Sequence, residues 1–200
     1  NFLEKNIDFL EKNHDYAGSI GESSLISRDD DKNGKVIKNS ERFQYVCPVD
    51  NNDFNDRVNF YLKFNMGIQL YSIFRTEHIK FANFRRNKPN FGTWQGDFVT
   101  ILKILKRGKL HVDIESYYYK EISEKSHSII GYMKKLKFTR YEIFFSKIKF
   151  STWFYREFGF KIFFKNWQYM TVLNLKWTIG IFSEVIRICK RTISGQSRYW

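Results

Sequence analysis

The alternation of apolar and polar residues is clearest in the stretch Leu110-His111-Val112-Asp113-Ile114-Glu115. Apolar side chains at every second position are typical of a strand with one buried face. Further along, apolar residues return at helical spacing, at Ile122, Ile129, Ile130, Met133 and Leu136. The last turn of this expected helix also carries cations, which the helix dipole favours there, at Lys134, Lys135 and Lys137. The sequence therefore predicts a strand that begins near residue 109, followed by a helix over residues 120–137.

The next fifty residues are strongly aromatic and predict mainly strands. Residues 138–154 and 159–164 are interrupted at Arg156-Glu157, which favours a hairpin of two long strands. Residues 172–175 predict one short helical turn, and residues 179–188 predict a final strand. The predicted order β-α-β-β-α-β, with a shortened second helix, is that of a small ferredoxin-like α+β sandwich, in which helices cover one face of a sheet.

The chain begins with an internal repeat, in which Phe2-Leu3-Glu4-Lys5-Asn6 recurs as Phe9-Leu10-Glu11-Lys12-Asn13. This spacing predicts a short amphipathic helix with one apolar face, made of Phe2, Leu3, Ile7 and Leu10. Such a helix packs on its own domain or docks on a neighbouring protein, and the sequence leaves both alternatives open.

Residues 17–55 are rich in Gly, Ser, Asp and Asn and predict a loop or linker. Its clearest turn, Asp29 to Gly34, resembles the opening of a calcium loop. The twelfth position of that loop would be Ser40, where a glutamate is needed, so we expect a solvated acidic turn instead. Residues 98–105 predict a short helix that ends at Lys106-Arg107-Gly108.

Charge is distributed unevenly along the chain, whose formal net charge is +13. Residues 1–60 contain 8 Lys and Arg against 12 Asp and Glu, a net charge of −4, so residues 61–200 have 26 against 9, a net charge of +17. A surplus of this size repels itself unless an anionic partner offsets it. The sequence therefore predicts a polyanionic partner for the later two thirds of the chain.

Aromatic and basic residues alternate between residues 56 and 108, in a pattern suited to irregular RNA. Rings and guanidinium groups can stack on unpaired bases while Lys and Arg neutralise phosphates. The plainer alternative is a chain that buries its rings and exposes its charges to solvent. The segments that carry the pattern are Phe74-Arg75, Phe84-Arg85-Arg86, Lys88-Pro89, Phe91 and Trp94.

The composition of the chain predicts the cellular compartment in which the protein works. The longest uncharged stretches are far shorter than the roughly 18 residues of a spanning helix, so we expect no membrane span. Frequent Phe, Tyr, Asn, Lys and Ile are typical of an AT-rich organelle genome. The N-terminal segment contains Glu4, Asp8, Glu11 and Asp15 and does not resemble a transit peptide, so we expect the protein to be encoded in a mitochondrion and to work in its matrix.

Residue patterns of catalysis and metal binding are missing from the sequence. His14, His78, His111 and His127 are scattered, and Cys47 and Cys189 are isolated thiols without the spacing of a zinc site. The segment Gly92 to Gly96 lacks the Lys-Ser/Thr of a phosphate loop. Asp113 and Glu115 share one strand face, where alternation predicts solvent-facing carboxylates. We therefore expect a non-enzyme without a cofactor, a metal or a small-molecule substrate.

The segment from residue 109 to 188 resembles the universal small-subunit ribosomal protein S-ten family, by the order and spacing of several short stretches. These stretches are Leu110 to Tyr117, the helix Lys120 to Lys137, Ile143 to Lys149, Arg156-Glu157 with Phe160-Lys161-Ile162 and Lys165, and Leu175 with Gly180-Ile181 and Glu184-Val185. The resemblance divides the chain into a lineage-specific extension (1–108), an S-ten-like domain (109–188) and a tail (189–200).

The resemblance implies a structural constituent of the small ribosomal subunit head, bound to ribosomal RNA and to neighbouring ribosomal proteins. Basic side chains would then neutralise RNA phosphates without reading base sequence. The predicted RNA-binding residues are Arg75, Arg85, Arg86, Lys88, Arg107, Lys134, Lys135, Lys137, Arg140, Lys147, Lys149, Arg156, Lys161 and Lys165.

One stretch supports an alternative function. Ser151-Thr152-Trp153-Phe154-Tyr155-Arg156-Glu157 resembles the Asn-Trp-Tyr-Glu-Arg-Glu box of an organelle-encoded peripheral-arm subunit of respiratory complex I. The His-Pro-Asp-Leu-Arg-Arg run that follows this box in that family is missing here, and that family is usually less basic.

Overall fold

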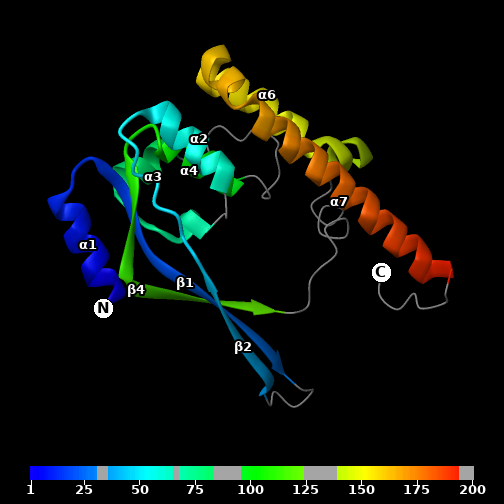
Figure 1. The fold of residues 1–200 in the computed structure, drawn as a ribbon, viewed down its shortest axis with the longest axis horizontal. Helices are drawn as coiled ribbons and strands as arrows, with labels where there is room; N and C mark the ends of the chain where they lie inside the picture. The colour runs from blue at the N-terminus through cyan, green and yellow to red at the C-terminus, as the bar shows by residue number, and fades with distance from the viewer. Residues whose placement is uncertain (31–35, 65–67, 83–95, 124–138, 194–200) are drawn as a thin grey trace. The chain divides into compact units, whose positions relative to one another are not determined.

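A computed structural model describes residues 1–30, 36–64, 68–82, 96–123 and 139–193 of the chain (Figure 1). They form two units. The N-terminal unit contains the described residues up to 82 together with residues 96–123, and the C-terminal unit contains residues 139–193.

The N-terminal unit is a mixed α and β structure. Its helices are α1 (Phe2–Lys12), α2 (Phe54–Phe64), the 3-10 helix η1 (Ile68–Tyr71), α3 (Thr76–Ala82) and α4 (Gly96–Ile104). Its strands are β1 (Tyr16–Asp30), β2 (Val36–Gln44), β3 (Ile73–Phe74) and β4 (Lys109–Ser123).

Strand β1 is the centre of a four-stranded sheet. Its N-terminal half pairs with β3 and its C-terminal half with β2, both antiparallel, while β4 runs parallel to it along the other edge from Tyr16 to Arg28. Parallel neighbours require a long crossover connection. Here that connection includes α2, η1, β3, α3 and α4.

The pairing of β1 with β4 contains a wide bulge. Gly21 pairs with Asp113, but the next residue, Glu22, pairs with Tyr117, so three residues of β4 are inserted. A Cβ atom at Gly21 would lie 2.4 Å from the carbonyl oxygen of Ser116. The bulge therefore needs glycine at position 21, because any side chain would collide with the backbone of the neighbouring strand.

The two faces of the sheet have different partners. Ile20 and Val112 point to one face and pack with Val46 and with Ile68 of η1. Ser19 and His111, which precede Ile20 and Val112 in their strands, face the opposite side of the sheet. There they contact Asn6 and Phe9 of α1. The predicted strand at residues 110–115 is confirmed and extends to Ser123. Of its predicted buried face, Leu110 and Val112 are buried, whereas Ile114, which lies in the bulge, is 68% exposed.

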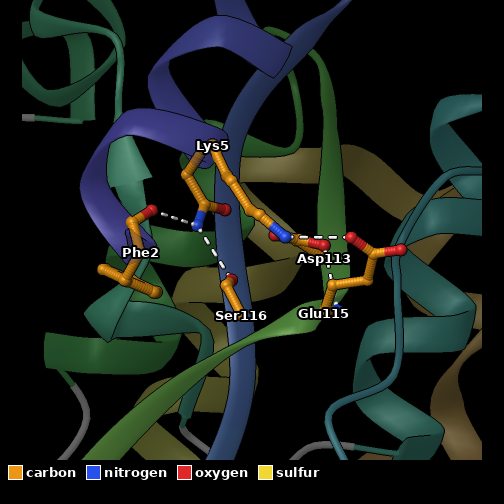
Figure 2. A network of polar contacts seen from close by, with 6 residues as sticks. Phe2, Lys5, Asp113, Glu115 and Ser116 are labelled. Carbon is orange, nitrogen blue, oxygen red and sulfur yellow. Dashed lines mark hydrogen bonds and ion pairs between the residues drawn. The ribbon is translucent and has the colours of Figure 1, made fainter.

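Helix α1 is confirmed as a helix, but its predicted apolar face is only partly right. Leu10 is buried and Phe2 half-buried as predicted, whereas Leu3 and Ile7 are 57% and 43% exposed and Asn6 is buried. The amide of Asn6 donates to the hydroxyl of Ser116 (3.2 Å) and to the carbonyl of Phe2 (2.8 Å), and its oxygen accepts from Ser19 (2.5 Å). Figure 2 shows the bonds that reach Phe2 and Ser116, beside the ion pair between Lys5 and Glu115. Polar groups of the sheet thus decide which side of α1 is buried.

The C-terminal unit consists of α6 (Arg140–Lys165) and α7 (Trp167–Ile193). The helices run antiparallel, because Phe144 contacts Phe182 near one end while the amide of Asn174 bonds the Ser151 hydroxyl (2.9 Å) further along. Helix α6 is interrupted at Gly159, whose φ of 81° lies in the left-handed region that favours glycine.

The strands predicted in residues 138–164 and 179–188, and with them the ferredoxin-like order of elements, are wrong, since the described residues there are helical. Phenylalanine and isoleucine favour strands locally, but in α6 the buried rings Phe150, Phe154 and Phe158 recur every four residues. This spacing places them on one helical face, so a helix buries the three rings together and this packing overrides local propensity. The short turn predicted at residues 172–175 is part of α7.

Two further expectations change in the N-terminal unit. Residues 17–55 are not a loop, because β1 and β2 form a hairpin around the acidic turn, of which residues 31–35 lie outside the described part. The helix predicted at 98–105 is confirmed as α4, while residues 120–123 belong to β4 and residues 124–138 lie outside the described part.

The domain boundary expected after residue 108 falls inside the N-terminal unit, because β4 pairs with β1 along most of its length. The expected C-terminal tail, residues 189–200, begins inside α7. Among the described helices, none is long and apolar enough to cross a lipid bilayer, as the sequence predicted.

Candidate nucleic-acid interface

Helices α3 and α4 pack against each other and bring several cations to one part of the N-terminal unit. Lys80 stands in the last turn of α3, Lys103 in the last turn of α4, and Lys106 and Arg107 in the turn that follows α4. Lys80 and Arg107 are exposed, and the two others are half-buried. We call these four residues the α3–α4 basic cluster.

An aromatic ring supports this cluster. The guanidinium carbon of Arg107 lies 3.8 Å from the ring centroid of Phe81, and both side chains reach the surface. An arginine held flat on a ring keeps its charge while losing conformational freedom. A fixed planar cation next to an exposed ring is suited to both phosphates and unstacked bases.

His78 lies on α3 beside the cluster and adds little to its charge. The pKa of His78 is lowered below its ordinary value, first by burial and then by the charges of Arg75 and Arg107, against the opposing effect of Glu77. The Glu77 carboxylate lies 3.9 Å from the His78 imidazole. A neutral imidazole is the expected state near neutral pH, so the local charge comes from Lys and Arg.

Arg75, which the sequence placed in the RNA-binding set, lies within the fold. Its guanidinium donates to the carbonyls of Tyr16 (3.1 Å), Asn13 (3.3 Å) and Leu10. Leu10 and Asn13 lie at the C-terminal end of α1 and Tyr16 begins β1, so these bonds join the helix end to the sheet. The side chain is therefore committed to holding α1 against the sheet.

Helix α6 carries the predicted residues of the C-terminal unit. Arg156, Lys161 and Lys165 are exposed and Lys149 is half-buried. Lys147 is only 5% exposed, and its ammonium lies 5.1 Å from the ring centroid of Trp177. Burial lowers the pKa of Lys147 to about 8. This lysine belongs to the contact between α6 and α7 and does not face a polyanion.

The other predicted RNA-binding residues are not among those that the structure brings together. Arg140 is the first residue of α6, and only its backbone is described. Outside the described residues lie Arg85, Arg86, Lys88, Lys134, Lys135 and Lys137. The first three of these follow α3 directly in the sequence.

Sequence reasoning missed several exposed or half-buried cations that the helices bring to the surface. They are Lys80, Lys103 and Lys106 in the N-terminal unit, and Lys176, Arg187 and Lys190 on α7. The run Lys103 to Arg107 carried a usable signal, since three of its five residues are basic. On α7 the grouping of Lys176, Arg187 and Lys190 was missed because residues 179–188 were predicted as a strand. A strand and a helix place different residues on one face.

The carboxylates considered for acid-base chemistry have structural partners. Glu115 pairs with Lys5 at 2.9 Å, and the Asp113 Oδ1 accepts from the backbone N–H of Glu115 at 3.0 Å (Figure 2). Among the described residues, no group of three or more His, Cys, Asp or Glu side chains could hold a metal ion.

No protein-family model, no curated protein and no solved structure matches the chain.

Proposed function

We propose that the protein is an RNA-associated structural protein, whose cations offset the phosphates of a large folded RNA. The observation that supports this most directly is the α3–α4 basic cluster with Arg107 fixed on Phe81. The unequal charge of the chain, −4 before residue 61 and +17 after it, supports the same conclusion.

The more specific proposal is a constituent of the small ribosomal subunit, bound to ribosomal RNA and neighbouring ribosomal proteins in a mitochondrion. Composition and charge support it. The resemblance to the S-ten family contributes less, because α6 and α7 occupy the residues at which that family has strands. The proposal therefore does not include a split β-α-β fold.

RNA binding is tested with the full chain and a fluorescent structured RNA in a salt titration. We expect log affinity to fall by several units for each tenfold rise in salt concentration. The double variant Lys80→Gln/Arg107→Gln should bind about tenfold more weakly and with a salt slope smaller by about 1 to 2. Phe81→Leu should also weaken binding, because it removes the ring that supports Arg107.

The matched control is Lys12→Gln/Lys63→Gln, which removes the same charge from exposed positions on α1 and α2. An affinity independent of salt, or equal losses in both double variants, would contradict a specific role for the cluster. The ribosomal proposal is tested separately by sedimentation of a cell extract. Migration with a small ribosomal subunit supports it, and migration with a respiratory membrane complex supports the complex I alternative.

A further inference from the structure

Helix α7 has a second apolar stripe that α6 covers only at its edge, where Phe182 contacts Phe144. Its residues Val172, Leu175, Ile179, Phe182 and Ile186 are 45% to 58% exposed. They are spaced alternately three and four residues apart, which is the heptad pattern of a helix-packing seam. The residues of α7 that pack on α6, such as Met170 and Ile181, lie on a different side of the helix.

The seam has a matching apolar strip on α6. Tyr141, Phe145, Ile148 and Tyr155 are 40% to 60% exposed and also repeat at helical spacing. Between the two helices runs an open groove of about 510 Å³ with uncharged lining residues, among them Phe145 and Ile148 of the α6 strip and Leu175 of the α7 seam. The groove thus meets the seam at Leu175, and a helix pair with apolar residues on its outer side is an incomplete bundle.

Cations border this apolar surface on both helices. Lys149 and Arg156 each follow a residue of the α6 strip by one position, and Lys176 follows Leu175 of the α7 seam in the same way. One position is a rotation of about 100°, so these cations lie at the edges of the strips. The two acidic side chains described in this unit are partly or fully buried, at Glu157 and Glu184.

We propose that the α6–α7 pair receives an amphipathic helix of another protein, whose apolar heptads pack along the α7 seam and beside the groove at Leu175, and whose flanks carry Asp or Glu. Residues 140–193 contain ten Lys and Arg against three Asp and Glu, a net charge of +7. This surplus favours an acidic occupant over a second copy of the same chain. Lys176 follows Leu175 of the seam by one position, and Lys190 follows Cys189, which continues the same spacing beyond Ile186. A partner's flanking carboxylates would reach these two lysines.

RNA fits the α7 seam less well. Bases stack on flat rings, whereas four of the five seam residues, Val172, Leu175, Ile179 and Ile186, are branched aliphatic side chains at the spacing of helix-to-helix contacts. The inference does not depend on RNA binding by the α3–α4 basic cluster.

The probes for the test are two synthetic helical peptides of three heptads with Ile and Leu at the core positions. One has Glu at the flanking positions, and the other has Lys. Fluorescence anisotropy with the full chain should show the Glu peptide binding at least tenfold more tightly than the Lys peptide. Ile179→Asn should weaken binding of the Glu peptide at least tenfold, because it places an amide in the seam. Lys176→Glu/Lys190→Glu should reverse the preference between the two peptides.

The control for the charge reversal is Lys12→Glu/Lys63→Glu, on α1 and α2, which should leave the preference unchanged. Equal affinity for both peptides, or no binding to either, would overturn the proposal. Self-association of the unmodified chain in analytical ultracentrifugation that Ile179→Asn abolishes would identify a second copy as the occupant instead. Binding to vesicles of anionic lipid that Ile179→Asn abolishes would identify a membrane surface. Ile179→Asn should leave RNA affinity unchanged, so the outcome of this test is distinct from that of the salt titration.

Discussion

The guanidinium of Arg57 donates two hydrogen bonds to the main-chain carbonyl of Leu105, at 3.0 and 3.2 Å, and thereby joins α2 to the end of α4. The same group donates to the carbonyls of Asn51 and Asn52, at 2.9 and 2.6 Å. Arg57 is 8% exposed and burial lowers its pKa, yet arginine keeps its charge. One buried side chain therefore satisfies three carbonyls at the base of the α3–α4 basic cluster.

Arg57→Gln should destabilise the N-terminal unit by about 3 kcal/mol, because it leaves buried carbonyls without donors. Hydrogen exchange of the α2 and α4 amides, measured by mass spectrometry, should become faster. The control Arg156→Gln, at an exposed position of α6, should change exchange of these amides very little. Unchanged protection in the Arg57 variant would show that other contacts hold α4 in place.

Asn6→Ala should cost more stability than Ile7→Ala, although isoleucine is by far the more apolar residue. The change at Asn6 leaves the hydroxyls of Ser19 and Ser116 without a buried partner, at a cost of about 2 kcal/mol. The change at Ile7, which is 43% exposed, should cost less than about 1 kcal/mol. Urea denaturation followed by circular dichroism compares the two variants, and the reverse order would contradict the buried face of α1.

Gly21→Ala and Gly180→Ala should have opposite effects. A Cβ at Gly21 meets the Ser116 carbonyl at 2.4 Å, so alanine should destabilise the bulge by about 1 to 3 kcal/mol. A Cβ at Gly180 meets nothing within 4 Å, and alanine there should stabilise α7 by about 0.5 to 1 kcal/mol. Hydrogen exchange in β1 and β4 reports the first effect, and urea denaturation of the C-terminal unit by tryptophan fluorescence reports the second.

The C-terminal unit should become more stable as pH rises above neutrality. Burial lowers the pKa of Lys147 from 10.5 to about 8, so between these values the unfolded chain binds more protons than the folded one. Stability then increases with pH, by about 2 kcal/mol between pH 7.5 and 9.5. Denaturation followed by tryptophan fluorescence measures this rise. The variant Lys147→Met should show a much flatter profile, and an equal rise in both proteins would contradict the assignment.

Local sequence determined the elements whose periodicity is strong and whose partners are near in the chain. The alternation at Leu110 to Glu115 specified a strand, the repeat at Phe2 and Phe9 specified a helix, and the apolar run after Gly96 specified α4. The sequence also fixed the uneven charge, because charge is a property of composition. It identified Arg107 as a candidate contact, since basic residues in a short run remain near one another in any fold.

Tertiary structure decided what depends on partners far away in the chain. Only the pairing of β1 with β4 shows that Ser116 meets Asn6, 110 positions earlier, and that a polar residue shares the buried side of α1 with Leu10. Aromatic and β-branched residues favour strands by local propensity, so the helical state of α6 and α7 rests on packing, such as that of Ile181 with Phe144 across the two helices. Residues on opposite faces of a strand can share one face of a helix. The exposed seam of α7 therefore exists only because these residues form a helix and not a strand.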